Sequence, residues 1–386
     1  MKILHLAIDD KFTPFAQDVF ESAFPGSNEF RVIRIADATT RFVQPAANVR
    51  FVPQRYWFSR ALDCDLREAD CLVVHSMTRW FSRAVERAPR GLPVVWHGWG
   101  ADYYGLLDGY ADHLYLPLTE ALLPTLNGVE RTSVRDRARR AVRFVANGLL
   151  FRNWMQRTLK RVDVISMLPD EFVLLQRSQP GLHAVFHQLY CSSAEDSFSH
   201  GAKNMHGLDL LLGNSATPTN NHLDAFEQLR RLDLEGRDIV VPLSYGLADY
   251  ADAVCAHGHR LFGTRFVPLR SYLSPAEYSE RIAACGFVFM NHVRQQATGT
   301  VSLSLFKGAK VFLREENLLF PFYRSKGAHV HRFPDAFGPY ADSTEDVFSP
   351  LTQKQRDENR RIIAEYWSKS RIVAETQRLQ SVVGKT

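Results

Sequence analysis

The sequence predicts an α/β protein built from two Rossmann-like domains that face each other across a cleft. The chain has 386 residues, more than one ordinary hydrophobic core requires. Short apolar runs alternate with longer helical patterns, which is typical of parallel sheets covered by helices. This alternation stops once, in the polar stretch 192–207, which we interpret as the linker between the domains.

The first domain is expected to span residues 1–195. Runs such as DCLVVH and PVVWH are short, continuous and apolar, as strands buried on both faces of a sheet are. The segments between them repeat their apolar residues with a period near 3.6, which indicates helices. The predicted strands are 1–8, 30–35, 70–75, 93–97 and 161–166, and the predicted helices are 12–23, 80–88 and 169–176.

The second domain is expected to span residues 208–345 and to repeat the same alternation. Its predicted strands are 208–212, 238–242, 265–267, 287–290 and 311–313, and its predicted helices are 220–231, 247–257, 274–284 and 300–308. The tail, residues 350–386, has a charged pattern that indicates one long helix or two, and we expect it to pack back on the first domain.

Composition restricts the class of protein. Hydrophobic residues make up 45% and charged residues 23%, and no run approaches 18 apolar residues. Only six residues separate Lys2 from Asp9, too few for a signal-peptide core, so we expect the protein in the cytosol. The five cysteines never form CxxC, and the triplet DCD at 63–65 precedes a strand without further ligands. We therefore predict no metal site and no cofactor.

One region is strongly basic. Ten lysines and arginines lie between Arg131 and Arg161, against the single acid Asp136. Cationic residues alternate there with aromatic and aliphatic ones, as in helices that lie on an anionic membrane surface. A solvated surface helix is the alternative, and nucleic-acid binding is disfavoured because the rest of the chain is not strongly basic. The residues predicted to contact the membrane are Arg139, Arg140, Arg143, Phe144, Phe151 and Trp154.

Two motifs in the second domain have residues suited to a phosphate-containing ligand. LLGNSATPTNNH follows a strand: a glycine allows close backbone approach, and Asn and Ser can cap the helix whose N–H groups would face a phosphate. VVPLSYG places Tyr245 and Gly246 at a strand end, where an aromatic ring can stack on a base or ribose. Ordinary capping, and an ordinary core or rim tyrosine, remain the alternatives.

NHVRQQATGT, residues 291–300, is a dense polar run between a strand and a helix. Arg294, Gln295 and Gln296 could satisfy a diphosphate or sugar hydroxyls, together with the helix start at Gly299 and Thr300. So many polar groups at a strand end are costly unless they are solvated or bound to a ligand.

VVWHGWGADYY, residues 94–104, is the corresponding motif of the first domain. Its two glycines permit a tight turn that could project His97 and Asp102 into the cleft. Either residue could take a proton from an acceptor hydroxyl. An aromatic-rich loop that closes the domain core is the alternative.

Taken together and in this order, WHGWGADYY, LLGNSATPTNNH, VVPLSYG, RQQATGT and KGAKVFLREEN resemble one family. It is the bacterial TDP-N-acetylfucosamine:lipid II N-acetylfucosaminyltransferase family of enterobacterial common antigen synthesis, also described as a 4-alpha-L-fucosyltransferase family. The resemblance covers roughly residues 94–317. Residues 122–153 resemble an insertion, and Ala-Thr-Pro-Thr follows GNS where the family has a more charged link, so a different deoxy-amino sugar remains an alternative.

The resemblance implies a GT-B fold, a TDP-sugar donor and a polyprenyl-diphosphate-linked glycan acceptor at the cytoplasmic face of the bacterial inner membrane. The protein would be a peripheral glycosyltransferase (hexosyltransferase) that transfers an N-acetylfucosamine-like sugar, with Asp102 and His97 as catalytic candidates. The implied donor-binding residues are Gly213, Asn214, Ser215, Asn220, Asn221, Tyr245, Gly246, Arg294, Gln295, Gln296, Gly299 and Thr300. The alternatives are a nucleotide-sugar epimerase of twin-Rossmann type and a non-catalytic, membrane-associated sugar-nucleotide-binding protein.

Overall fold

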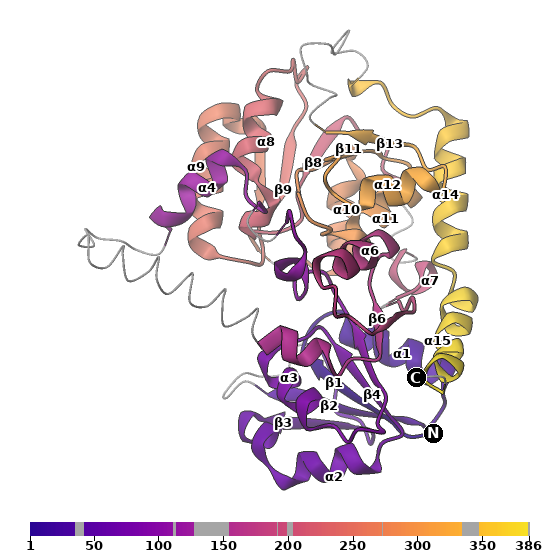
Figure 1. Cartoon of the computed structure of the whole chain (residues 1–386). Coiled ribbons are helices and arrows are strands. Elements are labelled where there is room, and N and C mark those ends of the chain that lie inside the picture. Colours follow the sequence, from indigo (N-terminus) through magenta and orange to yellow (C-terminus); the bar gives the residue numbers. More distant parts are fainter. Residues whose placement is uncertain are drawn as a thin grey trace, which may run out of the picture. The chain divides into compact units, whose positions relative to one another are not determined.

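A computed structural model describes residues 1–34, 42–110, 113–126, 154–190, 192–198, 204–271, 273–333 and 347–384. The described chain forms two compact units (Figure 1). Unit 1 contains residues 1–110, 154–193 and 367–384, and unit 2 contains residues 113–126 and 194–366, as far as each range is described. Each unit is built on one sheet.

The sheet of unit 1 has the strand order β3-β2-β1-β4-β5-β6-β7, and all its pairings are parallel. Its central strands are buried on both faces, which explains their continuous apolar sequences. The strands are β1 (Ile3–Ile8), β2 (Asn28–Arg34), β3 (Val49–Pro53), β4 (Cys71–His75), β5 (Val94–His97), β6 (Val164–Ser166) and β7 (Val185–Phe186).

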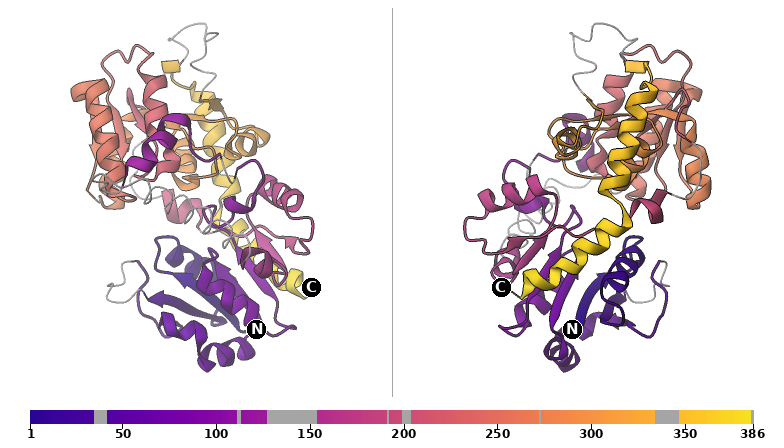
Figure 2. Two further views of the ribbon diagram at one scale, coloured as in Figure 1. Left: turned by 60° about the vertical axis from the view of Figure 1, so that its left-hand side comes forward. Right: turned by 90° about the vertical axis from the view of Figure 1, so that its right-hand side faces the viewer.

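Helices connect these strands. They are α1 (Thr13–Ala23), α2 (Arg60–Glu68), α3 (Arg79–Arg87), helical residues 154–159, α6 (Pro169–Ser178) and the C-terminal α15 (Lys369–Val383). α15 lies against α1, and its residues Leu379 and Val383 join the core formed by β1, β4, β5 and β6 (Figure 2). The end of the chain thus packs back on the N-terminal sheet, as the sequence predicts.

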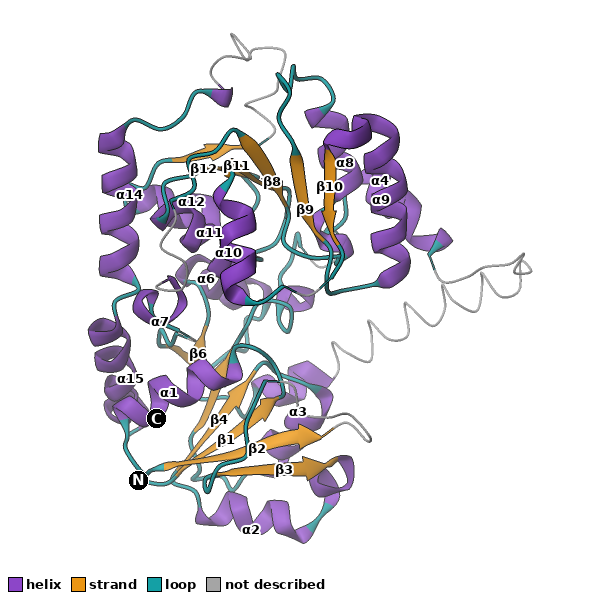
Figure 3. Cartoon of the chain, turned by 180° about the vertical axis from the view of Figure 1, so that it is seen from behind, coloured by secondary structure: helices purple, strands orange, loops and turns teal. Residues whose placement is uncertain are grey.

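The sheet of unit 2 has the order β10-β9-β8-β11-β12-β13, again all parallel. Its strands are β8 (Asp209–Leu212), β9 (Ile239–Pro242), β10 (Phe266–Leu269), β11 (Cys285–Met290), β12 (Lys310–Leu313) and β13 (Val330–Arg332). Because parallel crossovers are right-handed, helices that lead toward opposite edges cover opposite faces. α8 and α9 therefore lie on one face and α10, α11 and α12 on the other (Figure 3).

The helices of unit 2 are α4 (Pro117–Leu122), α7 (Ala194–Phe198), α8 (His222–Leu229), α9 (Ala248–Phe262), α10 (Pro275–Ala283), α11 (Thr298–Phe306), α12 (Leu319–Ser325) and α14 (Gln353–Tyr366). α14 packs on α11. The core under α8 and α9 is rich in aromatic rings; Phe226, for example, meets Phe262 and Phe266 edge to face. Short 3₁₀ turns (Gln54–Phe58, Tyr104–Leu106, Leu123–Thr125, Pro218–Asn220 and Gly263–Arg265) complete the described elements.

Residues 113–126 belong to unit 2, although they lie in sequence between β5 and β6 of the first sheet. α4 lies beside α8 (Figure 1). The carboxylate of Asp224 accepts hydrogen bonds from the backbone N–H groups of Leu118 (2.9 Å) and Thr119 (3.0 Å), and so caps α4. Leu126 is buried in the core of unit 2. This docking could not be anticipated from the sequence order.

The predicted fold class is confirmed. The elements missed by the sequence analysis are short or lie at sheet edges: β3, β7, β13, α2, α4 and α12. The polar stretch interpreted as the linker contains α7, which packs on α11. Its start coincides closely with the change of unit, between Ser193 and Ala194.

Candidate functional site

The carboxyl ends of β8 and β11 lie next to each other in the second sheet, because β8 pairs with β11 on one side and with β9 on the other. The strand order reverses direction at this point. In open parallel sheets, ligands bind outside the carboxyl ends of the strands at such a reversal. The loops that follow β8, β9 and β11 begin at Gly213, Leu243 and Asn291, and they form the candidate site of unit 2.

Gly213 begins the first loop in a backbone conformation that favours glycine. Its φ is +68°, and a Cβ there would lie 2.7 Å from both Asn220 Oδ1 and His222 Nε2. Asn220 Oδ1 accepts a hydrogen bond of 2.9 Å from the backbone N–H of Asn214, while Asn220 Nδ2 donates one of 3.2 Å to Ser215 Oγ. The tight turn leaves the Asn214 side chain partly exposed at the strand end.

The side chain of Gln296 joins the loop after β11 to the loop after β8. Its Nε2 donates to Asn214 Oδ1 at 3.0 Å, and its Oε1 accepts from Thr219 Oγ1 at 2.6 Å. Asn214 Nδ2 in turn donates to the hydroxyl oxygen of Tyr245 at 2.9 Å. Residues from three separate sequence motifs therefore meet in one hydrogen-bond network.

Tyr245 is the most accessible member of this network, with 46% of its surface exposed. The next residue, Gly246, has φ +121°, and a Cβ there would lie 2.4 Å from the carbonyl of Ala216. The missing side chain allows the backbone on both sides of Gly246 to pair with Ala216, through hydrogen bonds of 2.7 and 2.9 Å.

The start of α11 carries a second group of predicted donor residues. Arg294 Nη1 donates to the carbonyl oxygen of Gln295 at 3.0 Å, and Gln295 Nε2 donates to Thr298 Oγ1. Gly299 is exposed and Thr300 is partly exposed in the first turn. N–H groups in a first helical turn lack partners within the helix, so this helix end and the Arg294 guanidinium together favour an anion.

Three of the residues predicted to bind the donor are buried inside unit 2. Asn220 and Asn221 are 0% exposed and Ser215 is 1% exposed. The amide of Asn221 accepts from the N–H of Leu116 at 2.9 Å and donates to the carbonyl of Asn291 at 3.2 Å. Because their polar groups are already used inside the protein, these residues position the loops and do not offer free groups to a ligand.

In unit 1, the Asp102 carboxylate is buried, with 7% exposure, and accepts three hydrogen bonds. Oδ2 accepts from the Met77 N–H at 2.7 Å and from Trp96 Nε1 at 2.8 Å, and Oδ1 accepts from the Trp99 N–H at 2.9 Å. Burial raises the pKa of Asp102, and these hydrogen bonds oppose that effect. Asp102 thus anchors the turn between β5 and the following 3₁₀ turn.

His97, the last residue of β5, is 2% exposed and belongs to a row of buried histidines. Its Nδ1 lies 3.3 Å from His75 Nδ1, and His75 Nε2 lies 3.0 Å from His5 Nδ1. Burial lowers the pKa of His97 to about 4, so its ring is neutral at neutral pH. The sequence suggested a more open position for this side chain.

Of the residues predicted to contact a membrane, only Trp154 lies within the described chain, where it is partly exposed at the start of helical residues 154–159. Arg139, Arg140, Arg143, Phe144 and Phe151 lie outside the described residues. Among the described helices, none is both long and apolar enough to cross a membrane.

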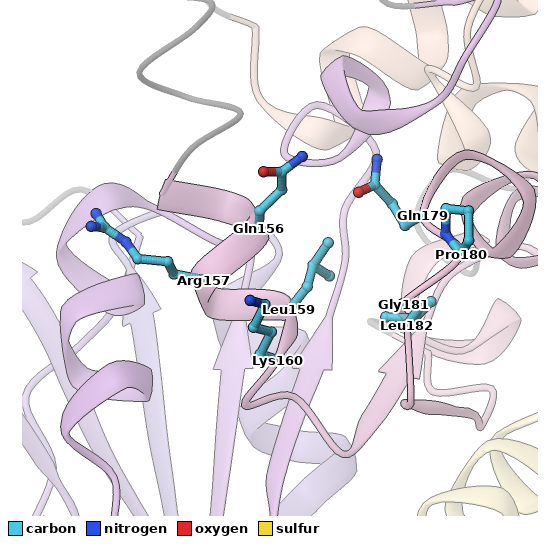
Figure 4. Close-up of a pocket in the computed structure, with 8 residues that line it drawn as sticks. All are labelled: Gln156, Arg157, Leu159, Lys160, Gln179, Pro180, Gly181 and Leu182. Atoms are coloured by element: carbon cyan, nitrogen blue, oxygen red, sulfur yellow. The ribbon is translucent and has the colours of Figure 1, made fainter.

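A hollow of about 330 Å³ lies elsewhere on unit 1 (Figure 4). It is lined by Gln156, Arg157, Leu159, Lys160, Gln179, Pro180, Gly181 and Leu182. Residues 156–160 precede β6 and residues 179–182 precede β7 in sequence, and Gln179 Nε2 donates a hydrogen bond of 3.2 Å to the carbonyl of Leu106. Within the described ranges, no three His, Cys, Asp or Glu side chains are grouped to hold a metal ion. Asp63 and Asp65 of the DCD triplet form ion pairs with arginines instead.

Several residues of the unit 2 network were not among those predicted from the sequence. Thr219 donates to Gln296, and His292 Nε2 lies 2.8 Å from Asn220 Oδ1. Asn291 Nδ2 donates to the carbonyl of Asn221 at 2.9 Å. The polar character of the segments after β8 and β11 could have indicated them, because all of these residues lie inside or next to those motifs.

Comparison with solved structures identifies the fold. The chain is similar to Anabaena Alr3699/HepE in complex with UDP (10% identity, all of both chains covered, TM-score 0.58) and to sucrose-phosphate synthase from Thermosynechococcus elongatus (7% identity, all of both chains covered, TM-score 0.60). It is also similar to a glycosyltransferase from Rickettsia africae (10% identity, 100% of this chain and 99% of that chain covered, TM-score 0.60). The fold is the two-domain α/β fold of GT-B glycosyltransferases.

A protein-family model matches part of the chain. The model described as 4-alpha-L-fucosyltransferase, glycosyl transferase group 56, matches residues 175–327, which contain the three loops of the candidate site. This match confirms the resemblance found in the sequence, and the chain is a glycosyltransferase. No curated protein sequence matches it.

Proposed function

We propose that this glycosyltransferase moves a deoxy-amino sugar, similar to N-acetylfucosamine, from a TDP-sugar to a polyprenyl-diphosphate-linked glycan in bacterial surface polysaccharide synthesis. The observation that carries the proposal is the network of Asn214, Tyr245 and Gln296, which joins three loops at the reversal point of the second sheet. The solved UDP and UDP-glucose complexes of Alr3699/HepE support a nucleotide-sugar donor for a chain of this fold.

In this proposal the donor diphosphate lies at the first turn of α11, next to Arg294. The N–H groups of Gly299 and Thr300 and the guanidinium balance its charge, which is why we expect a donor site without a metal ion. The exposed ring of Tyr245 stacks on the base or ribose. Gly213, Gly246, Ser215, Asn220 and Asn221 hold the loop backbones in place.

The acceptor hydroxyl loses its proton to a base of unit 1 while its oxygen attacks the anomeric carbon, and TDP leaves with the electrons of the broken bond. Asp102 and His97 stay the candidates for this base. The ring of His97 is neutral at neutral pH, and the carboxylate of Asp102 accepts hydrogen bonds from three donors.

The test is a transfer assay with the full chain, TDP-N-acetylfucosamine and a polyprenyl-diphosphate-linked disaccharide. We expect TDP release and an acceptor heavier by one sugar, and loss of both in Arg294→Ala. Conversion of the donor to a second nucleotide sugar without acceptor would show an epimerase. Donor binding without any turnover would show a non-catalytic binding protein. Either result contradicts the proposal.

We further propose that residues 139–154 contact the anionic surface of the cytoplasmic leaflet. Flotation with liposomes that contain anionic lipid tests this. Arg139, Arg140 and Arg143 changed together to Glu should abolish flotation. A matched control changes Arg60, Arg79 and Arg90, three exposed arginines of unit 1, to Glu. Equal flotation of both triple variants would show that the membrane contact lies elsewhere.

A further inference from the structure

Tyr115 is held against the candidate donor site by Asn221. The Asn221 side chain donates from Nδ2 to the carbonyl of Leu114 at 3.2 Å and accepts at Oδ1 from the N–H of Leu116 at 2.9 Å. One amide thus pairs with the backbone on both sides of Tyr115, as a neighbouring strand would. Asn221 has φ +51°, in the left-handed region that Asn tolerates better than most residues.

The same asparagine is part of the site. Asn221 and Asn291 exchange hydrogen bonds, from Asn291 Nδ2 to the Asn221 carbonyl at 2.9 Å and from Asn221 Nδ2 to the Asn291 carbonyl at 3.2 Å. Asn291 begins the loop that carries Arg294 and Gln296. Asn221 therefore contacts both the backbone on either side of Tyr115 and the loop that we assign to diphosphate binding.

The segment that carries Tyr115 is firmly attached to unit 2. Asp224 caps α4 through the N–H groups of Leu118 and Thr119 and accepts from Thr119 Oγ1 at 2.7 Å. Thr119 is fully buried, and Leu126 ends the segment inside the core. α4 lies beside α8 in both views (Figures 1 and 3). These contacts fix the chain that follows Tyr115, and Asn221 fixes the residues directly before and after it.

The backbone contacts of Asn221 place Tyr115 next to the loop that carries Arg294. Burial raises the pKa of the Tyr115 hydroxyl, and the positive charge of Arg294 opposes this shift, as expected for groups within electrostatic range of each other. The hydroxyl is protonated at neutral pH and can donate a hydrogen bond. Tyr115 is partly exposed, as a contact with a bound ligand requires.

We propose that Tyr115 is a further donor-binding residue, which the chain between β5 and β6 supplies to the site of unit 2, and that its hydroxyl donates a hydrogen bond to the diphosphate beside Arg294. This proposal rests on the proposed function. It makes Asn221 a positioning residue for Tyr115. The segment 113–126 then belongs to the donor site although it lies far from the donor motifs in sequence.

The test is the affinity of the full chain for TDP, measured by calorimetry at a temperature where each variant is fully folded. Tyr115→Phe removes only the hydroxyl and should weaken TDP binding about tenfold, as expected for one hydrogen bond to a charged group. Arg294→Ala should weaken it more. Because both groups bind the same anion, the double variant should lose less than the product of the two factors.

Tyr366→Phe is the matched control. Tyr366 is also partly exposed and belongs to unit 2, but it packs on Phe322 and Lys326 at the end of α12. It should bind TDP like the wild type. If Tyr115→Phe binds as tightly as this control while Arg294→Ala is impaired, the proposal for Tyr115 is wrong and the donor site stands. If neither variant changes the affinity, the donor site is wrong and Tyr115 loses its role with it.

Discussion

Gln296 Nε2 donates a hydrogen bond of 3.0 Å to Asn214 Oδ1, across 82 positions of sequence. The contact joins the loops after β8 and β11 at the point where the sheet order reverses. Asn214 uses its Nδ2 for Tyr245, so both ends of one amide are engaged. A change at any of these side chains is therefore expected to affect the shape of the whole candidate site.

Gln296→Glu tests the electrostatics of this site. The carboxylate can keep the bond from Thr219, and the Asn214 amide can turn to donate to it, but a negative charge at this buried position should lower the melting temperature. The added negative charge should weaken TDP binding by tenfold or more through repulsion of the diphosphate. Gln228→Glu, on α8, is the matched control and should bind TDP normally. Equal affinities of the two variants would contradict this role of Gln296.

Gly213→Ala tests the close packing under the first loop. Both Gly213 and Gly236 have positive φ, +68° and +80°, but only at Gly213 would a Cβ collide, at 2.7 Å from two buried polar atoms. Gly236→Ala should cost about 1–2 kcal/mol of unfolding free energy, the backbone term alone. Gly213→Ala should cost more and should also impair TDP binding. Denaturation with urea measures the unfolding free energy of both variants. Equal losses would show that the loop can shift to accommodate the added Cβ at Gly213.

The substitution Asp102→Asn keeps the shape of the side chain but replaces one acceptor oxygen with a donor NH₂ group. All three neighbours of the carboxylate are donors, so an amide NH₂ must face at least one of them. We expect a loss of about 1–3 kcal/mol in unfolding free energy. Asp170→Asn, at an exposed position of the same unit, should cost much less. If Asp102 also acts as the base, kcat should fall at least a hundredfold in the folded variant, with little change in donor KM.

The buried histidines predict a pH dependence of stability. In the folded protein His97 stays neutral down to its pKa of about 4, whereas in the unfolded chain it binds a proton near pH 6.5. The unfolded state therefore binds more protons between these values, and stability falls as pH decreases from 6.5 toward 4. His97 alone accounts for about 2 kcal/mol between pH 7 and pH 5.

Urea denaturation at the two pH values measures this effect. His97→Gln should reduce the loss between pH 7 and pH 5 by that amount, because glutamine does not titrate and can still donate to His75. The wild-type protein, measured at the same two pH values, is the reference. An unchanged dependence in His97→Gln would show that the other buried groups carry it.

Several sequence patterns predicted which loops come together in the candidate site. The glycine after β8, the polar run after β11 and the tyrosine after β9 each follow a continuous apolar strand, and parallel strands end at one sheet edge. Burial could not be predicted in the same way. Asn220 and Asn214 are both asparagines in one loop, yet Asn220 is completely buried and holds the backbone, while Asn214 is partly exposed.

By itself, the sequence determined two α/β domains, most of their strands and the glycosyltransferase family resemblance, because these depend on local periodicity and on contiguous motifs. Only the tertiary structure decided that 113–126 packs on unit 2, that α15 returns to unit 1, and that Asn221 joins the backbone on both sides of Tyr115 to Asn291. These placements depend on which exposed apolar faces and capping groups remain unpartnered after each sheet has formed. The periodicity within one segment carries no information about such contacts with distant segments.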